Sequence, residues 1–276
     1  MTPFVLFVVI AIALCAAMAM AWLVALRTGR SGFIDAIWSF AVGGAGVAAA
    51  LLPVEGSAPV PERQYLVAAL VGVWSLRLGL HIVSRTLGGG DDPRYAQLRR
   101  EWGKEFPRRL FSFLQIQASA ALLLAIAVFA AARNPSPGLG FGDWLGLGIM
   151  AVAVLGEAIA DRQLSRFRND PANHGKVCEE GLWAYSRHPN YFFEWLGWLA
   201  YVAIAIDFGG GYPWGYAAIA APLFMYWLLV HVSGIPPLEA HMLRSRPRAF
   251  RDYQARVNAF WPGPRRQSGP SDKETR

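Results

Sequence analysis

Long apolar stretches separated by short polar segments dominate the pattern of this sequence. Several stretches reach the ~20 residues that an α-helix needs to cross about 30 Å of hydrocarbon, whereas a membrane β-barrel would show alternating segments of about 10 residues. The pattern therefore predicts an all-α, polytopic membrane protein. We expect seven spanning helices, at Pro3–Leu26, Phe33–Leu52, Tyr65–Ser84, Leu110–Ala131, Trp144–Ala160, Tyr191–Ile206 and Trp214–Ser233.

Basic residues are distributed unevenly among the segments that follow these spans. The segments after spans one, three, five and seven hold 23 of the 26 Lys and Arg residues. Cytoplasmic loops of membrane proteins carry such an excess. We therefore expect an odd number of spans, with the N-terminus outside and the C-terminus in the cytoplasm. This distribution accounts for the net charge of +7 without a nucleic-acid partner.

Composition and length favour a single integral-membrane domain over residues 1–276. The chain is 54% hydrophobic and only 16% charged, whereas a soluble domain carries about 25% charged residues. Cys15 lies in an apolar run and Cys178 in a polar segment, so no disulfide framework is indicated. No zinc-type arrangement of His and Cys occurs, and we expect no metal site. Residues 266–276 are polar and are expected to form a disordered tail.

The densest polar cluster lies within Gly181–Trp198, at the mouth of the sixth span. Arg187, His188, Asn190 and Glu194 fall within eight residues, directly before an apolar run. Such side chains are costly in a bilayer unless they are paired or face a cavity. Our hypothesis is that this cluster holds a charged, water-soluble cofactor at the cytoplasmic face.

A second cluster follows the fifth span. Glu157, Asp161 and Arg168 recur at spacings of four and seven residues, which places them on one helix face. Carboxylates can accept hydrogen bonds from ribose hydroxyls, and arginines can clamp phosphates. The alternative is that arginines at this helix end, such as Arg162 and Arg166, only reach lipid headgroups.

Two further polar segments lie on the predicted cytoplasmic side. Gly88–Tyr95 combines three glycines with Asp91, Asp92, Arg94 and Tyr95, and is either a ligand-binding loop or a flexible connection. It leads into Tyr95–Lys104, which has the pattern of an interfacial amphipathic helix.

The C-terminal segment contributes another polar group. Glu239, His241 and Arg244 either close the cofactor site or lie on a solvated helix.

A polar group is also expected inside the second and third spans. Arg77 and His81 lie one turn apart, with Trp74 one turn earlier, and Asp35 lies near the cytoplasmic end of the second span. One interpretation is a structural Asp35–Arg77 pair. The other is a pocket for the reacting end of a lipid-like substrate, in which a buried carboxyl group donates a proton.

The run G-L-W-A-Y-S-R-H-P-N-Y-F-F-E-W within Gly181–Trp198 resembles steroid 5-alpha-reductases and their bacterial relatives of the DUF1295 type. The resemblance extends over roughly Phe33 to Pro262. The wider superfamily includes isoprenylcysteine carboxyl methyltransferases, which share the R-H-P-x-Y element.

This resemblance implies seven membrane helices and NADPH in a cavity that opens to the cytoplasm. It implies residues 1–140 as substrate-side helices and 141–265 as the cofactor-binding half. The reductase Asn and Glu that bind the cofactor correspond to Asn190 and Glu194, and an Asp–Arg pair corresponds to Asp161 and Arg168. The cofactor-binding residues that we expect are Arg85, Arg94, Tyr95, Glu157, Asp161, Arg168, Tyr185, Arg187, His188, Asn190, Glu194, His231, Glu239, His241 and Arg244.

The substrate side departs from the reductase pattern. The family's Gln-Glu pair falls near Asp35, which is the only acid there, and its catalytic Tyr aligns with Trp74, which cannot act as a phenolic acid. Polarisation of the substrate carbonyl would then fall to Asp35 or Arg77. We expect Asp35, Trp74 and Arg77 to be the catalytic residues.

The preferred hypothesis is an NADPH-dependent reductase of a C=C bond conjugated to a carbonyl in a steroid-like or other lipid substrate. NADPH would enter from the cytoplasm of a bacterium and the substrate from its inner membrane.

The alternative is an S-adenosylmethionine-dependent methyltransferase of a lipid or isoprenyl thiol, although that donor lacks phosphates for Arg168. A third interpretation is a non-catalytic scaffold or transporter, for which broken helices and repeats would be typical. Substrate identity and oligomeric state stay open.

Overall fold

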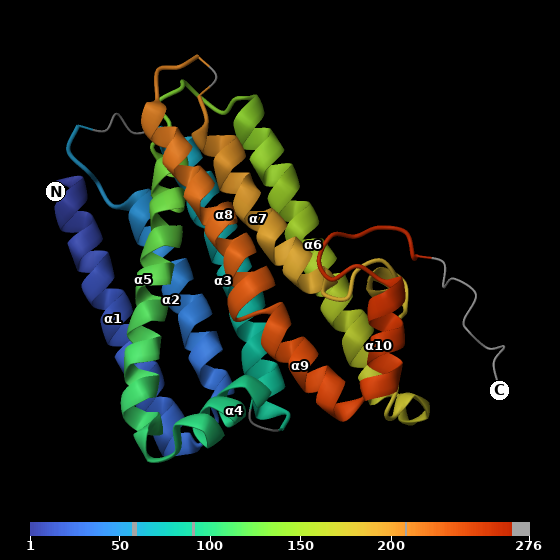
Figure 1. Cartoon of the computed structure of the whole chain (residues 1–276). Helices are drawn as coiled ribbons and strands as arrows, with labels where there is room; N and C mark the ends of the chain where they lie inside the picture. The colour runs from blue at the N-terminus through green and yellow to red at the C-terminus, as the bar shows by residue number, and fades with distance from the viewer. Residues whose placement is uncertain (57–59, 90–91, 208, 267–276) are drawn as a thin grey trace, which may run out of the picture. The chain divides into compact units, whose positions relative to one another are not determined.

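Helices make up all of the regular structure in residues 1–56, 60–89, 92–207 and 209–266, which are the residues that this computed structural model describes (Figure 1). The predicted all-α class is therefore confirmed for this part of the chain. Asp91 of the glycine-rich segment and residues 267–276 of the tail lie outside it. The α-helices are α1 (Pro3–Thr28), α2 (Gly32–Leu51), α3 (Pro61–Leu87), α4 (Pro93–Trp102), α5 (Phe106–Ala132), α6 (Phe141–Asn169), α7 (Pro189–Ala205), α8 (Ala220–Trp227), α9 (Ile235–Ser245) and α10 (Pro247–Arg256).

Among the described residues, six helical segments are long and apolar enough to cross a membrane, as is typical of a polytopic membrane protein. They are Pro3–Thr28, Gly32–Leu51, Pro61–Leu87, Arg94–Ala132, Phe141–Asn169 and Pro213–Ser245. They coincide with or contain six of the seven predicted spans, the second of which extends one residue beyond its segment. The sixth predicted span coincides with α7, whose 17 residues rise about 26 Å. The number of seven spans and the orientation stay predictions.

The fifth predicted span ends at Ala160, but α6 continues nine residues further, to Asn169. Neither Gly nor Pro occurs between Glu157 and Asp170, so nothing in the sequence stops the helix where its apolar part ends. The cluster Glu157, Asp161 and Arg168 consequently lies on one continuous helix, as its spacing predicted.

The seventh predicted span is not one regular α-helix. It begins with the 3-10 segment Pro213–Ile219 and ends, after α8, with a π-helical turn at Leu228–Val232. The amide of Ser233 donates to the carbonyl of Leu228 at 2.9 Å, and Gly234 follows where a Cβ would collide with the Leu229 backbone. The chain thereby leaves the helix axis before α9 begins.

The chain divides into two compact units. Unit 1 comprises Met1–Met150 and Trp198–Leu223, and unit 2 comprises Ala151–Gly197 and Phe224–Arg276. In unit 1, α1, α2, α3 and α5 pack against one another (Figure 1). Gly43 and Gly46 lie directly against Ser75 and Val71, the small-residue packing by which membrane helices approach closely.

One end of unit 1 is organised by a buried ion pair. Arg63 of α3 is 1% exposed and donates from Nε and Nη2 to the two carboxylate oxygens of Asp143, at 2.8 and 2.9 Å. Its remaining donors reach the carbonyls of Asn134 and Ser136, both at 2.7 Å, and of Gly138. Arg63 therefore holds the whole connection between α5 and α6.

In unit 2, single hydrogen bonds fasten the connecting segments to the helices. The indole of Trp183 donates to the carbonyl of Ala160 at 2.9 Å, and the hydroxyl of Tyr253 donates to the carbonyl of Trp183 at 2.5 Å. The hydroxyl of Ser186 donates to the carbonyl of Phe260 at 3.0 Å. The segment before α7 is thus fixed on one side to α6 and on the other to α10 and the residues after it. This unit contains most of the predicted cofactor residues.

Candidate functional site

The Arg-His-Pro-Asn element stands at the N-terminus of α7, in unit 2. A 3-10 turn, Gly181–Ala184, leads into it, and Pro189 begins the helix. Gly181 has φ 57°, and a Cβ there would collide with the side chain of Gln163, whose Oε1 accepts from the Leu182 amide at 2.9 Å. Only glycine meets both conditions without strain, so this turn fixes where the element begins.

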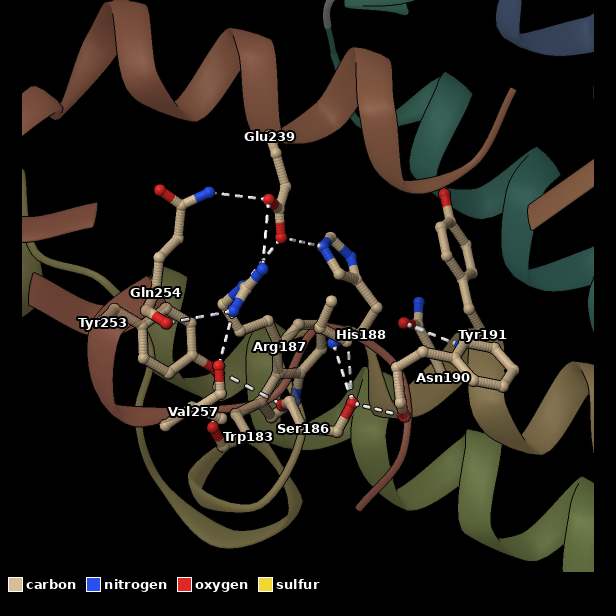
Figure 2. A network of polar contacts seen from close by, with 12 residues as sticks. Trp183, Ser186, Arg187, His188, Asn190, Tyr191, Glu239, Tyr253, Gln254 and Val257 are labelled. Atoms are coloured by element: carbon tan, nitrogen blue, oxygen red, sulfur yellow. Dashed lines mark hydrogen bonds and ion pairs between the residues drawn. The ribbon is translucent and has the colours of Figure 1, made fainter. Parts of the chain in front are cut away.

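Arg187 forms a two-point ion pair with Glu239 of α9 (Figure 2). Its Nε donates to Oε1 at 2.7 Å and its Nη2 to Oε2 at 3.2 Å. Its Nη1 donates to the carbonyls of Val257 and Gln254, and the Gln254 amide donates to Glu239 Oε2 at 2.7 Å. The side chains of Arg187 and Glu239 are only 10% and 14% exposed. This network joins the start of α7 to α9 and α10.

His188 belongs to the same network. Its Nε2 lies 3.1 Å from Glu239 Oε1, its amide donates to Ser186 Oγ, and its ring stacks on Tyr191 with centroids 5.6 Å apart. Burial lowers the pKa of His188, while Glu239 acts to raise it and Arg187 to lower it. The neutral ring must therefore carry its proton on Nε2, where it is donated to the carboxylate.

Asn190 and Asp161 meet, although 29 residues separate them in the sequence. The Nδ2 of Asn190 at the start of α7 lies 3.4 Å from Oδ1 of Asp161 on α6. The Asn190 Oδ1 accepts from the Tyr191 amide at 3.1 Å, which fixes the orientation of the amide group. Asn190 of the Gly181–Trp198 cluster and Asp161 of the cluster on α6 are therefore in contact.

The other predicted residues of unit 2 occupy different surroundings. Glu157 on α6 and Glu194 on α7 are both buried. Tyr185 is more than half exposed, whereas His231 packs edge-to-face on Tyr226 at a centroid distance of 5.9 Å. His241 and Arg244 lie on α9. In the described part of the chain, His241 makes no side-chain hydrogen bond or ion pair.

A hollow of about 110 Å³ opens beside Arg168 at the end of α6. Its walls include Lys176 and Arg246, neither of which was predicted as a site residue. Both look like ordinary basic residues of connecting segments in the sequence, and only the fold places them next to Arg168.

In unit 1, Asp35 pairs with Arg94 and Tyr95, so the predicted Asp35–Arg77 pair is wrong. The Tyr95 hydroxyl donates to Asp35 Oδ1 at 3.0 Å, and the Arg94 guanidinium binds Oδ2. These contacts connect the first turn of α4 with Asp35 in the first turn of α2. An aspartate in an ion pair is an acceptor, which favours a positioning role for Asp35. Its role as the acid stays a prediction.

Asp92 supports this arrangement at the N-terminus of α4. Its Oδ1 accepts from the backbone amide and the Nε of Arg94, both at 3.0 Å, and Arg85 Nη2 lies 3.4 Å from its Oδ2. Burial acts to raise the pKa of Asp92, but the bonds and charge of Arg94 and the charge of Arg85 outweigh it and lower the pKa. Arg85, Arg94 and Tyr95, which we expected at the cofactor, are thus linked to Asp35.

Trp74 is buried in unit 1 and packs edge-to-face against Trp198, with ring centroids 5.1 Å apart. Its indole therefore forms part of an aromatic wall. The three predicted catalytic residues, Asp35, Trp74 and Arg77, all belong to this unit.

The family described as "Protein of unknown function (DUF1295)" matches residues 21–257. The chain belongs to the DUF1295 family. The predicted resemblance to DUF1295-type relatives is thereby confirmed, and the steroid 5-alpha-reductase activity within it stays a prediction. No curated protein and no solved structure matches the chain.

The match of this DUF1295 protein runs from within α1 to the residue after α10, so both units belong to the family's common structure. Within its described residues, no group of three or more His, Cys, Asp or Glu side chains could hold a metal ion. Its polar groups instead suit hydrogen bonding: a carboxylate beside an amide at Asp161 and Asn190, and exposed cations near the end of α6.

Proposed function

We propose that this protein is a membrane reductase that uses NADPH to reduce a C=C bond conjugated to a carbonyl in a steroid-like or other lipid substrate. The reaction adds a hydride to the β-carbon and a proton to the α-carbon. Bound NADPH would supply the hydride. The protein would bind both molecules, exclude water and provide the proton.

The contact between Asn190 and Asp161 carries this proposal. A carboxylate accepts from hydroxyl groups, and an amide both donates and accepts, so together they suit a ribose or a carboxamide. Arg168 follows Asp161 by seven residues on α6, which is about 10 Å along the same helix face. A guanidinium at that distance suits a phosphate group of the same dinucleotide.

The Arg187–Glu239–His188 network supports the cofactor site indirectly. Its members bond to one another, and their direct task is to hold the start of α7 in position. Asn190 begins that helix, so the network sets where its amide lies. We therefore assign Arg187, His188 and Glu239 as positioning residues for the proposed NADPH site.

On the substrate side, we assign Trp74 and its partner Trp198 to an apolar wall and Arg77 to the carbonyl of the substrate. Asp35 would position Tyr95, whose phenol and the Arg94 guanidinium are the nearest donors to its carboxylate. The lipid would enter from the bilayer and NADPH from the cytoplasm.

The test is equilibrium binding of NADPH and of S-adenosylmethionine to the detergent-purified protein. We expect NADPH to bind, and Asn190→Ala and Asp161→Asn each to weaken it about 10-fold, since a bond to a ligand is worth on the order of 1.4 kcal/mol. Asn169→Ala, at the exposed end of α6, is the matched control and should bind as the wild type does. Binding of S-adenosylmethionine without NADPH would instead support the methyltransferase.

A catalytic assay completes the test. NADPH oxidation should depend on an added enone lipid, and the product should carry hydrogen from the cofactor at its β-carbon. NADPH binding without any enone-dependent oxidation would contradict the assigned reaction.

A further inference from the structure

The hollow at the end of α6 lies wholly within unit 2. It is bounded by α6, the segment 173–178 and the end of α9. Its volume of about 110 Å³ is below the ~300 Å³ at which pockets for whole small-molecule ligands begin. It has room for one moiety of a larger ligand.

The walls of this hollow are apolar inside and basic at the rim. Phe167 and Met242 contribute apolar surface, and Arg168, Lys176 and Arg246 contribute the cations. The ten lining residues include no Asp or Glu. An aromatic base whose ribose carries a phosphate matches this combination, because the base removes apolar surface from water and the phosphate meets the cations.

Arg246 is held in place by the protein. Its Nε donates to the carbonyl of Gly175 at 3.1 Å, and its Nη1 lies 3.6 Å from the sulfur of Met242. In the described part of the chain, neither Arg246 nor Lys176 makes an ion pair. Two cations at the rim therefore keep their charge available for an anion.

The carboxylate of Glu179, the residue after Cys178 in the sequence, is bound by cations outside the hollow. Glu179 accepts from Arg256 at 2.9 Å and lies 3.6 Å from Arg265. Its charge is thus compensated by cations that do not line the hollow, and the positive character of the rim persists.

We propose that this hollow binds the adenosine 2′-phosphate end of NADPH, and that Lys176 and Arg246 make the protein select NADPH over NADH. The inference rests on the proposed function, and extends it to residues that neither the sequence motifs nor the Asn190–Asp161 contact identifies. Arg168 connects the two regions, because it lies at the hollow and on the helix face of Asp161.

The experiment measures dissociation constants of NADPH and NADH for the full-length protein in detergent. The variants are Lys176→Ala, which removes an exposed side chain, and Arg246→Gln, which keeps a donor for the Gly175 carbonyl. Arg248→Gln, an exposed arginine of α10 outside the hollow, is the control. We expect the wild type to prefer NADPH, each variant to lower that preference about 10-fold by weakening NADPH alone, and the control to leave it unchanged.

A second arm uses fragments that lack the nicotinamide half. Adenosine 2′-monophosphate should bind more tightly than adenosine, and the double variant K176A/R246Q should abolish that difference. If the wild type binds NADPH but both variants keep its preference over NADH, the inference is overturned and the proposed function stands. If it binds neither dinucleotide but still discriminates the fragments through Lys176 and Arg246, the phosphate site stands and the reductase falls. Equal binding of the two fragments to the wild type would overturn the site itself.

Discussion

Arg187 and Glu239 are joined by two hydrogen bonds, Nε to Oε1 and Nη2 to Oε2, across a sequence separation of 52 residues. Planar guanidinium and carboxylate groups match in this geometry, which lysine cannot reproduce. Both residues were expected to contact the cofactor. Their contacts instead join the start of α7 to α9, and His188 and Gln254 bind the same carboxylate.

The first prediction concerns the stability of this pair. Glu239→Gln leaves the nearly buried Arg187 guanidinium without its counter-charge, which costs on the order of 3 kcal/mol. We expect a lower unfolding midpoint of the purified protein, measured by thermal or chemical denaturation in detergent. Glu180→Gln, at an exposed carboxylate, is the control and should unfold as the wild type does.

A double variant separates pairing from simple loss of a side chain. R187M/E239L removes both charges, so it should recover part of the stability that E239Q loses. If E239Q unfolds at the same midpoint as the Glu180 control, the ion pair does not hold this unit together.

The second prediction is a pH dependence that originates at His188. Burial lowers its pKa below the ordinary value of 6.5, with Glu239, Arg187 and the stacked Tyr191 as its neighbours. As the pH falls below 6.5, the unfolded chain binds a proton that the folded protein does not. The free energy of unfolding therefore decreases, until the pH passes the lowered pKa and the loss levels off.

The measurement is the unfolding midpoint of wild type and H188Q between neutral and acidic pH. We expect the wild type to lose more stability on acidification than H188Q does. Replacement of the exposed His174 by Gln should leave the wild-type dependence intact. Parallel pH profiles for wild type and H188Q would contradict the assignment.

The spans were predictable because their apolar runs are long and often end sharply. Phe33–Leu52 agrees with α2 to within one residue at each end, since Gly32 and Pro53 flank the run. The end of α6 was missed because hydropathy marks where the apolar surface ends. The helix itself continues through polar residues that are good helix formers.

The site was predictable only where residues are close in sequence or share a helix face. Asp161 and Asn190 came from spacing and resemblance, and the fold brings them into contact. The partner of Asp35 is Arg94, 59 residues away, at the start of α4. No local pattern contains that information, and the same holds for Lys176 and Arg246 at the hollow.

The third prediction concerns the buried Arg63. R63K keeps the charge but loses the planar fork that serves Asp143 and three backbone carbonyls. Buried acceptors left without donors cost about 1–3 kcal/mol each. We expect a lower unfolding midpoint and faster cleavage of residues 134–142 by a nonspecific protease, with E62Q as the exposed control. Unchanged cleavage in R63K would show that Arg63 does not hold this connection.

The fourth prediction is the topology. Seven spans place the termini on opposite sides of the membrane, and six spans place them on the same side. In a C15A/C178A background, T2C and S136C should react with a membrane-impermeant maleimide in intact cells. S245C should react only after permeabilisation. Reaction of T2C and S245C from the same side would exclude the odd number of spans.

The fifth prediction uses Cys178, which lines the hollow at the end of α6, as a reporter of the proposed phosphate site. Burial raises the pKa of its thiol; a backbone hydrogen bond from Glu180 and the charge of Arg168 act to lower the pKa, and the charges of Glu180 and Glu179 act to raise it. Only the thiolate reacts with a maleimide, so the pH profile of labelling should shift to higher pH than in the same protein unfolded by denaturant.

In the C15A background, adenosine 2′-monophosphate should slow the labelling of Cys178 further, because it would cover the hollow, whereas adenosine should slow the labelling less. A pH profile equal to that of the unfolded chain would contradict the buried position of the thiol. Labelling that adenosine 2′-monophosphate does not slow would place its binding site elsewhere.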